Sequence, residues 1–338
     1  MVKIMAKRKK KQVKLKKRFK ILLFLIFLII LLQTNFFGLY KNKTIAKFNI
    51  VSMYNKAKEE KEQARRKKVY EDCIKGGLSE DNFNNDTKVK KQEVINYVNK
   101  NNIYYYYQDK TYNYEIKIKE NEALYGASLV KLSTALYLID NDIDLNIEKK
   151  YESRFKSGFS TGMSKHKIGD MVSLGELMKY SITYSDNTAH QMLYDYIGKT
   201  KLQEYSKSLG AKVLLEGWDH FGNQTASDMN IYLNRAYELF TLKENGKLLK
   251  EYMNNTDTNA LNFDDVTFLH KYGSYSTYFH DVGIYLGDHP YNVSILTQKG
   301  ESAGPSYVTK LSRLTYDFHN AYYDNLESYC HYEAYEKE

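Results

Sequence analysis

The chain has 338 residues and a formal net charge of +9, a length that suits one large domain with additional segments. Residues 1–20 hold eleven Lys or Arg and no Asp or Glu, which leaves 39 of the 50 basic side chains against all 41 acidic ones in residues 21–338. Because nucleic-acid binding requires clustered positive charge on the folded surface, this balance argues against a nucleic-acid partner. Two cysteines exclude a disulfide-rich scaffold, and eight scattered histidines form no metal motif, so we expect neither a metal nor a cofactor.

The amino-terminal segment predicts a membrane anchor. Residues 21–32 are an unbroken apolar run, and a largely apolar stretch continues to residue 40. Twenty residues at helical rise span about 30 Å, the thickness of a bilayer core. Since the basic residues 1–20 precede this run, the positive-inside rule predicts a single-pass signal anchor at 21–40, with a cytoplasmic amino terminus and an extracytoplasmic domain. Cleavage of a signal peptide and secretion is the alternative, although no small-x-small cleavage site follows the run.

The remaining chain predicts a stalk and one folded domain. Residues 41–88 are rich in Lys, Glu, Asn and Asp, which indicates a solvated stalk or linker. The domain, residues 89–338, begins with an amphipathic helix at 90–101. Two runs rich in β-forming residues follow at 103–108 and 114–118, and the turn-like segment between them predicts a hairpin.

Helices are predicted in the middle of the domain and strands towards its end. Helical spacing of apolar residues predicts helices at 128–140, 174–184, 188–197, 201–209 and 227–242. Strand patterns return at 266–271, 280–286 and 291–298, and a closing helix is predicted from about 306 to 323. Strands at both ends with helices between them indicate an α+β domain whose sheet joins the two ends of the chain.

A serine and a lysine three residues apart mark the start of the predicted helix at 128–140. Ser128 would lie near the positive end of the helix dipole, and Lys131 would lie on the same face one turn later. A lysine whose pKa is lowered by burial can accept the serine proton. Ser153 and Ser164 show the same spacing but lie in a polar loop. A simple helix cap is the alternative role for Ser128.

Two further polar motifs follow along the chain. Ser185-Asp186-Asn187 lies between two apolar helical segments, where a helix break and cap is the alternative interpretation. Lys271-Tyr272-Gly273 lies at the end of the predicted strand at 266–271. There it would present a cation and an open backbone edge to an acidic ligand, whereas an ordinary surface lysine is the alternative.

Taken in order, these three motifs resemble the signature of penicillin-recognising serine hydrolases, the class A β-lactamases in particular. The similarity extends over roughly residues 89–338, including the segments 174–189 and 312–319. It implies a β-lactamase/transpeptidase-like fold, with an antiparallel sheet flanked by helices and an all-helical subdomain. It also implies a serine hydrolase that opens β-lactams through an acyl-enzyme on Ser128.

The resemblance assigns a role to each motif residue. It implies that Ser128 is the nucleophile, that Lys131 is its proton partner and that Ser185 passes the proton to the leaving nitrogen. It implies substrate-binding positions at Asn187, Lys271, Tyr272 and Gly273, and an oxyanion hole made by the backbone N–H groups of Ser128 and Ser274. The implied ligand is a β-lactam or a D-Ala-D-Ala-type peptide, and no protein partner is identified.

Two departures from the family pattern bear on activity. The middle residue of the third motif is Tyr272, where the family has Thr or Ser. The loop after Gly210 is short and lacks the Glu-x-x-x-Asn pattern of the family, which leaves Glu216 and Asp219 as candidate deacylation bases. Without such a base the acyl-enzyme persists. The alternatives are therefore a D-Ala-D-Ala carboxypeptidase or transpeptidase (a penicillin-binding protein) with slow deacylation, or a non-catalytic module that binds cell wall or a partner.

Two residue pairs outside the catalytic motifs give further expectations. His270 and His280 flank the third motif and are expected either to line the cleft or to pack against the sheet. Cys73 and Cys330 lie near the two ends of the domain. The resemblance implies neighbouring terminal helices, which would permit a disulfide, but two free thiols are the default expectation.

Overall fold

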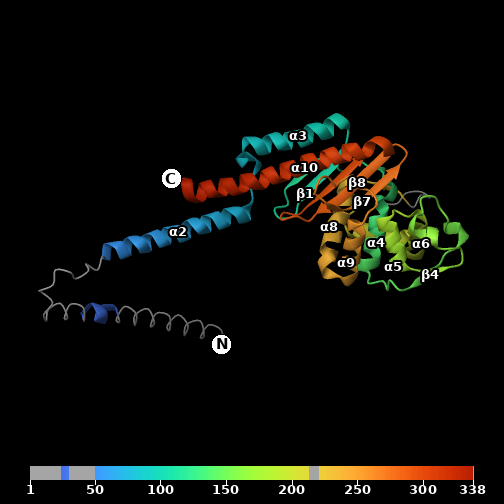
Figure 1. The fold of residues 1–338 in the computed structure, drawn as a ribbon, viewed down its shortest axis with the longest axis horizontal. Coiled ribbons are helices and arrows are strands. Elements are labelled where there is room, and N and C mark those ends of the chain that lie inside the picture. The colour runs from blue at the N-terminus through green and yellow to red at the C-terminus, as the bar shows by residue number, and fades with distance from the viewer. Residues whose placement is uncertain (1–23, 30–49, 213–220, 338) are drawn as a thin grey trace. The chain divides into compact units, whose positions relative to one another are not determined.

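The computed structural model describes residues 24–29, 50–212 and 221–337 (Figure 1). The chain divides into two units, Met1–Arg65 and Arg66–Glu338. Within the described residues no helix combines the length and the apolar character needed to cross a membrane. The predicted basic segment 1–20 lies outside the described residues, as does the predicted anchor at 21–40 except for residues 24–29, which are helical.

The second unit begins earlier than residue 89, where the sequence placed the start of the domain. Helix α2 (Ile50–Gly76) starts within the predicted stalk, and its residues from Arg66 onward belong to the second unit. A 3-10 turn, η1 (Glu80–Asn82), and helix α3 (Asn85–Asn101) follow. The last part of the predicted stalk is therefore built into the folded unit.

A five-stranded antiparallel sheet forms the centre of this unit, which confirms the α+β prediction. Its order is β2-β1-β9-β8-β7, so the first hairpin pairs with the last strand and β7 lies at an edge. The bounds are β1 (Tyr104–Asp109), β2 (Glu115–Ile118), β7 (Phe268–Tyr275), β8 (Tyr278–Tyr285) and β9 (Tyr291–Thr297).

The tyrosine run of β1 supplies both faces of the sheet, as alternation along a strand requires. Tyr105 and Tyr107 point into the cluster under α3 and α10 (Gly300–His331), which lie side by side along one face in Figure 1. Their hydroxyls bond the side chains of α10 residues, as in the 2.9 Å contact from Tyr105 to Thr315. Tyr104 and Tyr106 belong to the other cluster, which includes helix α8 (Ala226–Leu242). The sheet is thus covered on both faces.

A helical part packs beside the β7 edge, around the apolar helix α4 (Val130–Asp140). Nine of the eleven α4 residues are buried, and Lys131 is the one charged residue among those nine, which marks it as exceptional. The other helices are α5 (Leu174–Thr183), α6 (Asn187–Ile197), α7 (Lys199–Ser208) and α9 (Glu244–Asn254). Short elements connect them: η2 (Ala127–Leu129), η3 (Ser153–Phe155) and η4 (Gly162–Lys165), with the strand pairs β3 (Leu124–Tyr125) with β6 (Asn223–Gln224) and β4 (Glu148–Lys150) with β5 (Met171–Ser173).

The carboxy-terminal helix corrects the expectation of two free thiols. Helix α10 runs on to His331 instead of ending near residue 323, and a π-helical turn (Tyr332–Glu336) follows it. These extra turns bring Cys330 beside Cys73 of α2, with their Cα atoms 5.5 Å apart, and the two form a disulfide. Arg66 donates a hydrogen bond to the backbone carbonyl of Tyr335 on the same side, at 3.0 Å. The two ends of the second unit are therefore covalently joined.

Candidate active site

Ser128 lies on a constrained turn between the sheet and the helical part. It occupies η2, the 3-10 turn directly before α4, and the preceding Ala127 has a left-handed φ of +45°. The strand pair β3–β6 supports this turn, since Gly126 donates a backbone hydrogen bond to Gly222 at 3.0 Å. A Cβ on Gly126 would meet the Gln224 side chain at 2.3 Å. The position of the Ser128 backbone is therefore set by its neighbours.

Lys131 lies beneath Ser128, completely buried, and its ammonium is surrounded by oxygen atoms. Its Nζ is 2.8 Å from Ser128 Oγ, 2.5 Å from the Ser185 carbonyl oxygen and 2.7 Å from Asn187 Oδ1. Burial and, after it, the charge of Lys271 hold the pKa of Lys131 well below its usual value of 10.5. A lysine with a lowered pKa beside a serine hydroxyl can take up the hydroxyl proton.

The Ser185-Asp186-Asn187 segment both caps a helix and faces the lysines. Asp186 caps α6 by accepting from the backbone N–H of Ala189 at 2.9 Å, and it also accepts from the Met163 N–H at 2.9 Å. This capped turn holds Ser185 in a left-handed conformation, with φ of +51°. Ser185 Oγ lies 3.3 Å from Lys131 Nζ, so the segment that caps α6 also brings Ser185 to the buried lysine.

Lys271 enters the site from the edge strand β7 and is buried, unlike an ordinary edge lysine. Its Nζ lies 2.9 Å from Ser185 Oγ and 2.8 Å from the Tyr272 carbonyl oxygen. Burial lowers the pKa of Lys271 to about 7, against the opposing influence of Asp257 and Asp281. Ser185 Oγ therefore bridges two lysines whose charged forms are both disfavoured.

Gly273 allows β7 to pack directly on the turn that carries Ser128. A Cβ at Gly273 would lie 2.5 Å from the Gly126 carbonyl oxygen and 3.2 Å from the Leu129 amide nitrogen. Only a residue without a side chain fits this close approach. The contact brings Gly273 and Ser274 to the Ser128 turn, and these are the two backbone segments predicted to form an oxyanion hole.

One acidic residue of the site was missed by sequence reasoning. Asp257 follows α9, is exposed, and donates its backbone N–H to the Thr183 carbonyl oxygen at 3.0 Å. Its carboxylate interacts electrostatically with Lys131 and Lys271. The surrounding segment is uniformly polar, so no motif or hydrophobic pattern distinguished Asp257 from its neighbours.

The two histidines beside the third motif are packed within the sheet and do not line a cleft. His280 accepts from the Thr297 amide through Nδ1 at 3.0 Å, so its Nε2 donates to the Tyr125 carbonyl oxygen at 2.8 Å. Burial lowers the pKa of His280 to about 4, which keeps the ring neutral. His270 is buried against Asp281, with Nδ1 and Oδ1 2.9 Å apart.

The remaining residues that the sequence singled out are either exposed or outside the described residues. Ser153 and Ser164, with their partners Lys156 and Lys167, are exposed on the surface. Glu216 and Asp219, the candidate deacylation bases, lie outside the described residues. The first described residue after them, Phe221, has its ring centroid 5.5 Å from Lys131 Nζ. The chain therefore returns to the active site directly after the segment that holds both carboxylates.

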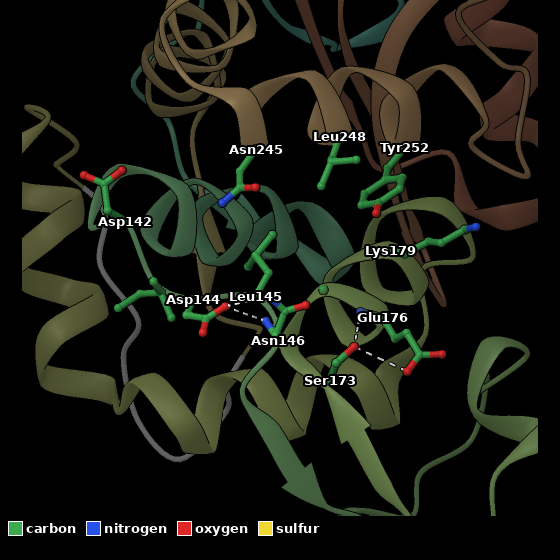
Figure 2. Close-up of a pocket in the computed structure, with 12 residues that line it drawn as sticks. Asp142, Asp144, Leu145, Asn146, Ser173, Glu176, Lys179, Asn245, Leu248 and Tyr252 are labelled. Atoms are coloured by element: carbon green, nitrogen blue, oxygen red, sulfur yellow. Dashed lines mark hydrogen bonds between the residues drawn. The ribbon is translucent and has the colours of Figure 1, made fainter.

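A separate pocket of about 460 Å³ lies between the loop after α4, the start of α5 and helix α9 (Figure 2). Its lining includes Leu145, Leu248 and Tyr252 with a polar rim, and it contains none of the residues that surround Ser128. Figure 2 shows the rim carboxylates of Asp144 and Glu176 directed at neighbouring side chains of the same rim. This pocket is therefore distinct from the Ser128 cluster.

The buried Ser128–Lys131 pair, brought together with Ser185 and Lys271 at the junction of a helical part and an antiparallel sheet, is typical of β-lactamase/transpeptidase-like serine hydrolases. The chain belongs to the Beta-lactamase enzyme family, whose model matches residues 87–319. No curated protein matches the chain.

Solved structures confirm the predicted fold. A mutant of PBP-A, in an acyl-enzyme complex with penicillin G, has a TM-score of 0.62 at 16% identity and covers 69% of this chain and 97% of its own. The TLA-3 extended-spectrum β-lactamase has a TM-score of 0.61 at 18% identity, and the alignment covers 69% of this chain and 99% of that protein. A class A β-lactamase representative from Bacteroides cellulosilyticus has a TM-score of 0.61 at 22% identity, and the alignment covers 70% of this chain and 99% of that protein.

Proposed function

We propose that the protein is a serine acyl hydrolase of the β-lactamase type that forms an acyl-enzyme on Ser128 with a β-lactam or a D-Ala-D-Ala-type peptide. The observation that carries this proposal is the 2.8 Å contact between Ser128 Oγ and the buried Lys131 Nζ, whose pKa is held low. Membership of the family and the acyl-enzyme complex of the similar PBP-A mutant support it.

The contacts suggest a route for the proton. Neutral Lys131 removes the Ser128 proton while Oγ attacks the substrate carbonyl, and backbone N–H groups of Ser128 and Ser274 stabilise the resulting oxyanion. Ser185 Oγ, within 3.3 Å of Lys131 Nζ and 2.9 Å of Lys271 Nζ, then delivers a proton to the leaving nitrogen. The C–N bond breaks, and an ester on Ser128 remains.

Deacylation distinguishes the possible activities of this site. Hydrolysis of the ester requires a base that activates water, and Glu216 or Asp219 is proposed for this role because Phe221 returns the chain to Lys131. If neither acts, the ester persists and the protein behaves as a carboxypeptidase or transpeptidase with slow turnover. A non-catalytic binding module is the second candidate, favoured by Tyr272, which takes the place of a small hydroxyl residue.

The proposed location is the cell membrane, with the domain outside the cytoplasm. The basic residues 1–20 before the apolar segment 21–40 support this topology. The Cys73–Cys330 disulfide supports it independently, because disulfides persist mainly in oxidising compartments. Secretion after signal cleavage is the alternative.

Turnover assays on the full chain test this proposal. Hydrolysis of several β-lactams and release of D-Ala from a short muropeptide are measured for wild type, Ser128→Ala and Ser164→Ala. Ser164 has the same Ser-x-x-Lys spacing but is exposed, so its variant is the matched control. We expect activity in wild type and Ser164→Ala and none in Ser128→Ala. Absence of activity and of any adduct in wild type favours the binding module.

A further inference from the structure

The pocket of about 460 Å³ beside α5 and α9 has the volume of a small-molecule site (Figure 2). Pockets that bind small ligands usually measure about 300–1,000 Å³ and combine apolar walls with a few polar groups. Leu145, from the loop after α4, and Leu248, from α9, extend into this pocket in Figure 2. The residues around Ser128 do not line it, so a ligand bound here would leave the acylation site free.

Tyr252 gives the pocket a buried polar group that lacks a partner. The residue is only 9% exposed, yet its hydroxyl forms no hydrogen bond within the described part of the chain. Figure 2 shows this hydroxyl directed into the pocket. Buried hydroxyl groups almost always have a hydrogen-bond partner, so the partner of Tyr252 has to come from the pocket itself.

The charges around the pocket favour a cation over an anion. The lining holds three carboxylates and one lysine. Asp142 is neutralised by Lys243, with Nζ and Oδ1 2.6 Å apart, and Figure 2 shows Lys179 extending away from the apolar walls. Asp144 and Glu176 accept hydrogen bonds from uncharged groups of the rim and have no ion-pair partner among the described residues. Two carboxylates therefore leave a net negative potential at the rim.

We propose that this pocket is a second ligand site, which binds a primary amine with an apolar body. The apolar body lies between Leu145 and Leu248, where its burial drives binding. The ammonium donates to the Tyr252 hydroxyl within the negative potential of Asp144 and Glu176, which favours an amine over an alcohol and disfavours a carboxylate. This inference does not depend on the proposed acylation, because the pocket shares no residue with that site.

Three matched probes test the site on the full chain. The probes are 3-phenylpropylamine, 3-phenylpropan-1-ol and 3-phenylpropanoate, which share one apolar body and differ in the head group. Binding is measured by ligand-observed NMR titration at neutral pH and low salt. We expect saturable binding of the amine with a dissociation constant of about 1 mM or lower. The alcohol should bind at least about threefold more weakly, and the carboxylate more weakly still. Tighter binding of the alcohol or the carboxylate, or no binding of the amine, overturns the inference.

Two variants show whether the amine occupies this pocket. Leu248→Trp places a larger side chain in the apolar space and should weaken amine binding by at least about tenfold. Tyr252→Phe removes only the unpartnered oxygen and should weaken it by about fivefold. Circular dichroism checks that each variant is folded, and Tyr252→Phe keeps the test decisive if Leu248→Trp is not. Unchanged amine affinity in Tyr252→Phe, or in a folded Leu248→Trp, overturns the inference.

A further variant tests the contribution of the rim charges. The double replacement Asp144→Asn with Glu176→Gln should remove most of the advantage of the amine over the alcohol. Asp264→Asn, at an exposed aspartate that pairs with Arg313 and does not line the pocket, is the control and should keep this advantage. An advantage that survives in the double variant overturns the inference. None of these measurements requires acylation, so they decide the second site whether or not the proposed function holds.

Discussion

Replacing Gly273 by alanine should disrupt the junction between β7 and the Ser128 turn without unfolding the protein. The added Cβ would lie 2.5 Å from the Gly126 carbonyl oxygen, whereas ordinary contacts begin at 3.4 Å. Both partners are backbone, so the strand and the turn must separate by roughly 1 Å. A displacement of about 1 Å at a catalytic site can cost on the order of 100-fold in rate. We therefore expect acylation of Ser128 in Gly273→Ala to fall by about 100-fold.

Intact-mass spectrometry of samples quenched at successive times measures the rate of adduct formation, and circular dichroism checks the fold. Gly158→Ala is the matched control, because Gly158 lies in the loop bonded to Asn187 but a Cβ there meets no atom within 4 Å. We expect the control to react within about threefold of wild type. A Gly273→Ala protein that is folded and acylated as fast as wild type would refute the argued role of this contact.

Three further predictions concern the lysines and the disulfide. Lys131→Arg should abolish acylation while the chain stays folded, since a guanidinium does not give up its proton. Acylation that continues in this variant would contradict the role of Lys131 as the base. The pKa of Lys271 is lowered from 10.5 to about 7 in the folded state, so the unfolded chain binds more protons between these two pH values. The free energy of unfolding should therefore rise with pH across this window. Urea titrations at several pH values should show a smaller rise in Lys271→Met. Replacing Cys73 and Cys330 by serine should lower the free energy of unfolding by about 2–5 kcal/mol, because the disulfide closes a loop with a sequence separation of 257. Acylation should stay unchanged, since the disulfide contacts none of the site residues. An unaltered unfolding midpoint would contradict the predicted loss of stability.

Local patterns were sufficient to predict most of the fold. The run of β-forming residues at 103–108 indicated a strand, and the structure places the successive tyrosines Tyr104 to Tyr107 alternately in opposite clusters. The apolar helix after Ser128 was equally clear, although a 3-10 turn that begins at Ala127, with a left-handed φ, precedes it. The sequence does not indicate that an alanine will adopt a left-handed φ. The boundaries, set by tertiary contacts, were less predictable, as the longer α10 shows.

The site combines a local pair with contacts that no local pattern reveals. Ser128 and Lys131 are three residues apart, so helical geometry alone brings them together. Ser185 and Lys271 are separated by 86 positions, and only the order of the motifs and their family resemblance indicated that they meet. Asp257 belongs to no motif, because its position depends on how α9 packs against β7. The position of a charged residue such as Asp257, which depends on tertiary packing, can be read only from the structure.

Locating the covalent adduct tests the acylation of Ser128 directly. The full chain is incubated with an excess of a β-lactam, digested, and sequenced by tandem mass spectrometry, with Ser128→Ala treated in parallel. Acylation of Ser128 predicts the added mass on the peptide that contains Ser128, and no adduct in the variant. An adduct on a different residue, or equal labelling of Ser128→Ala, would contradict it.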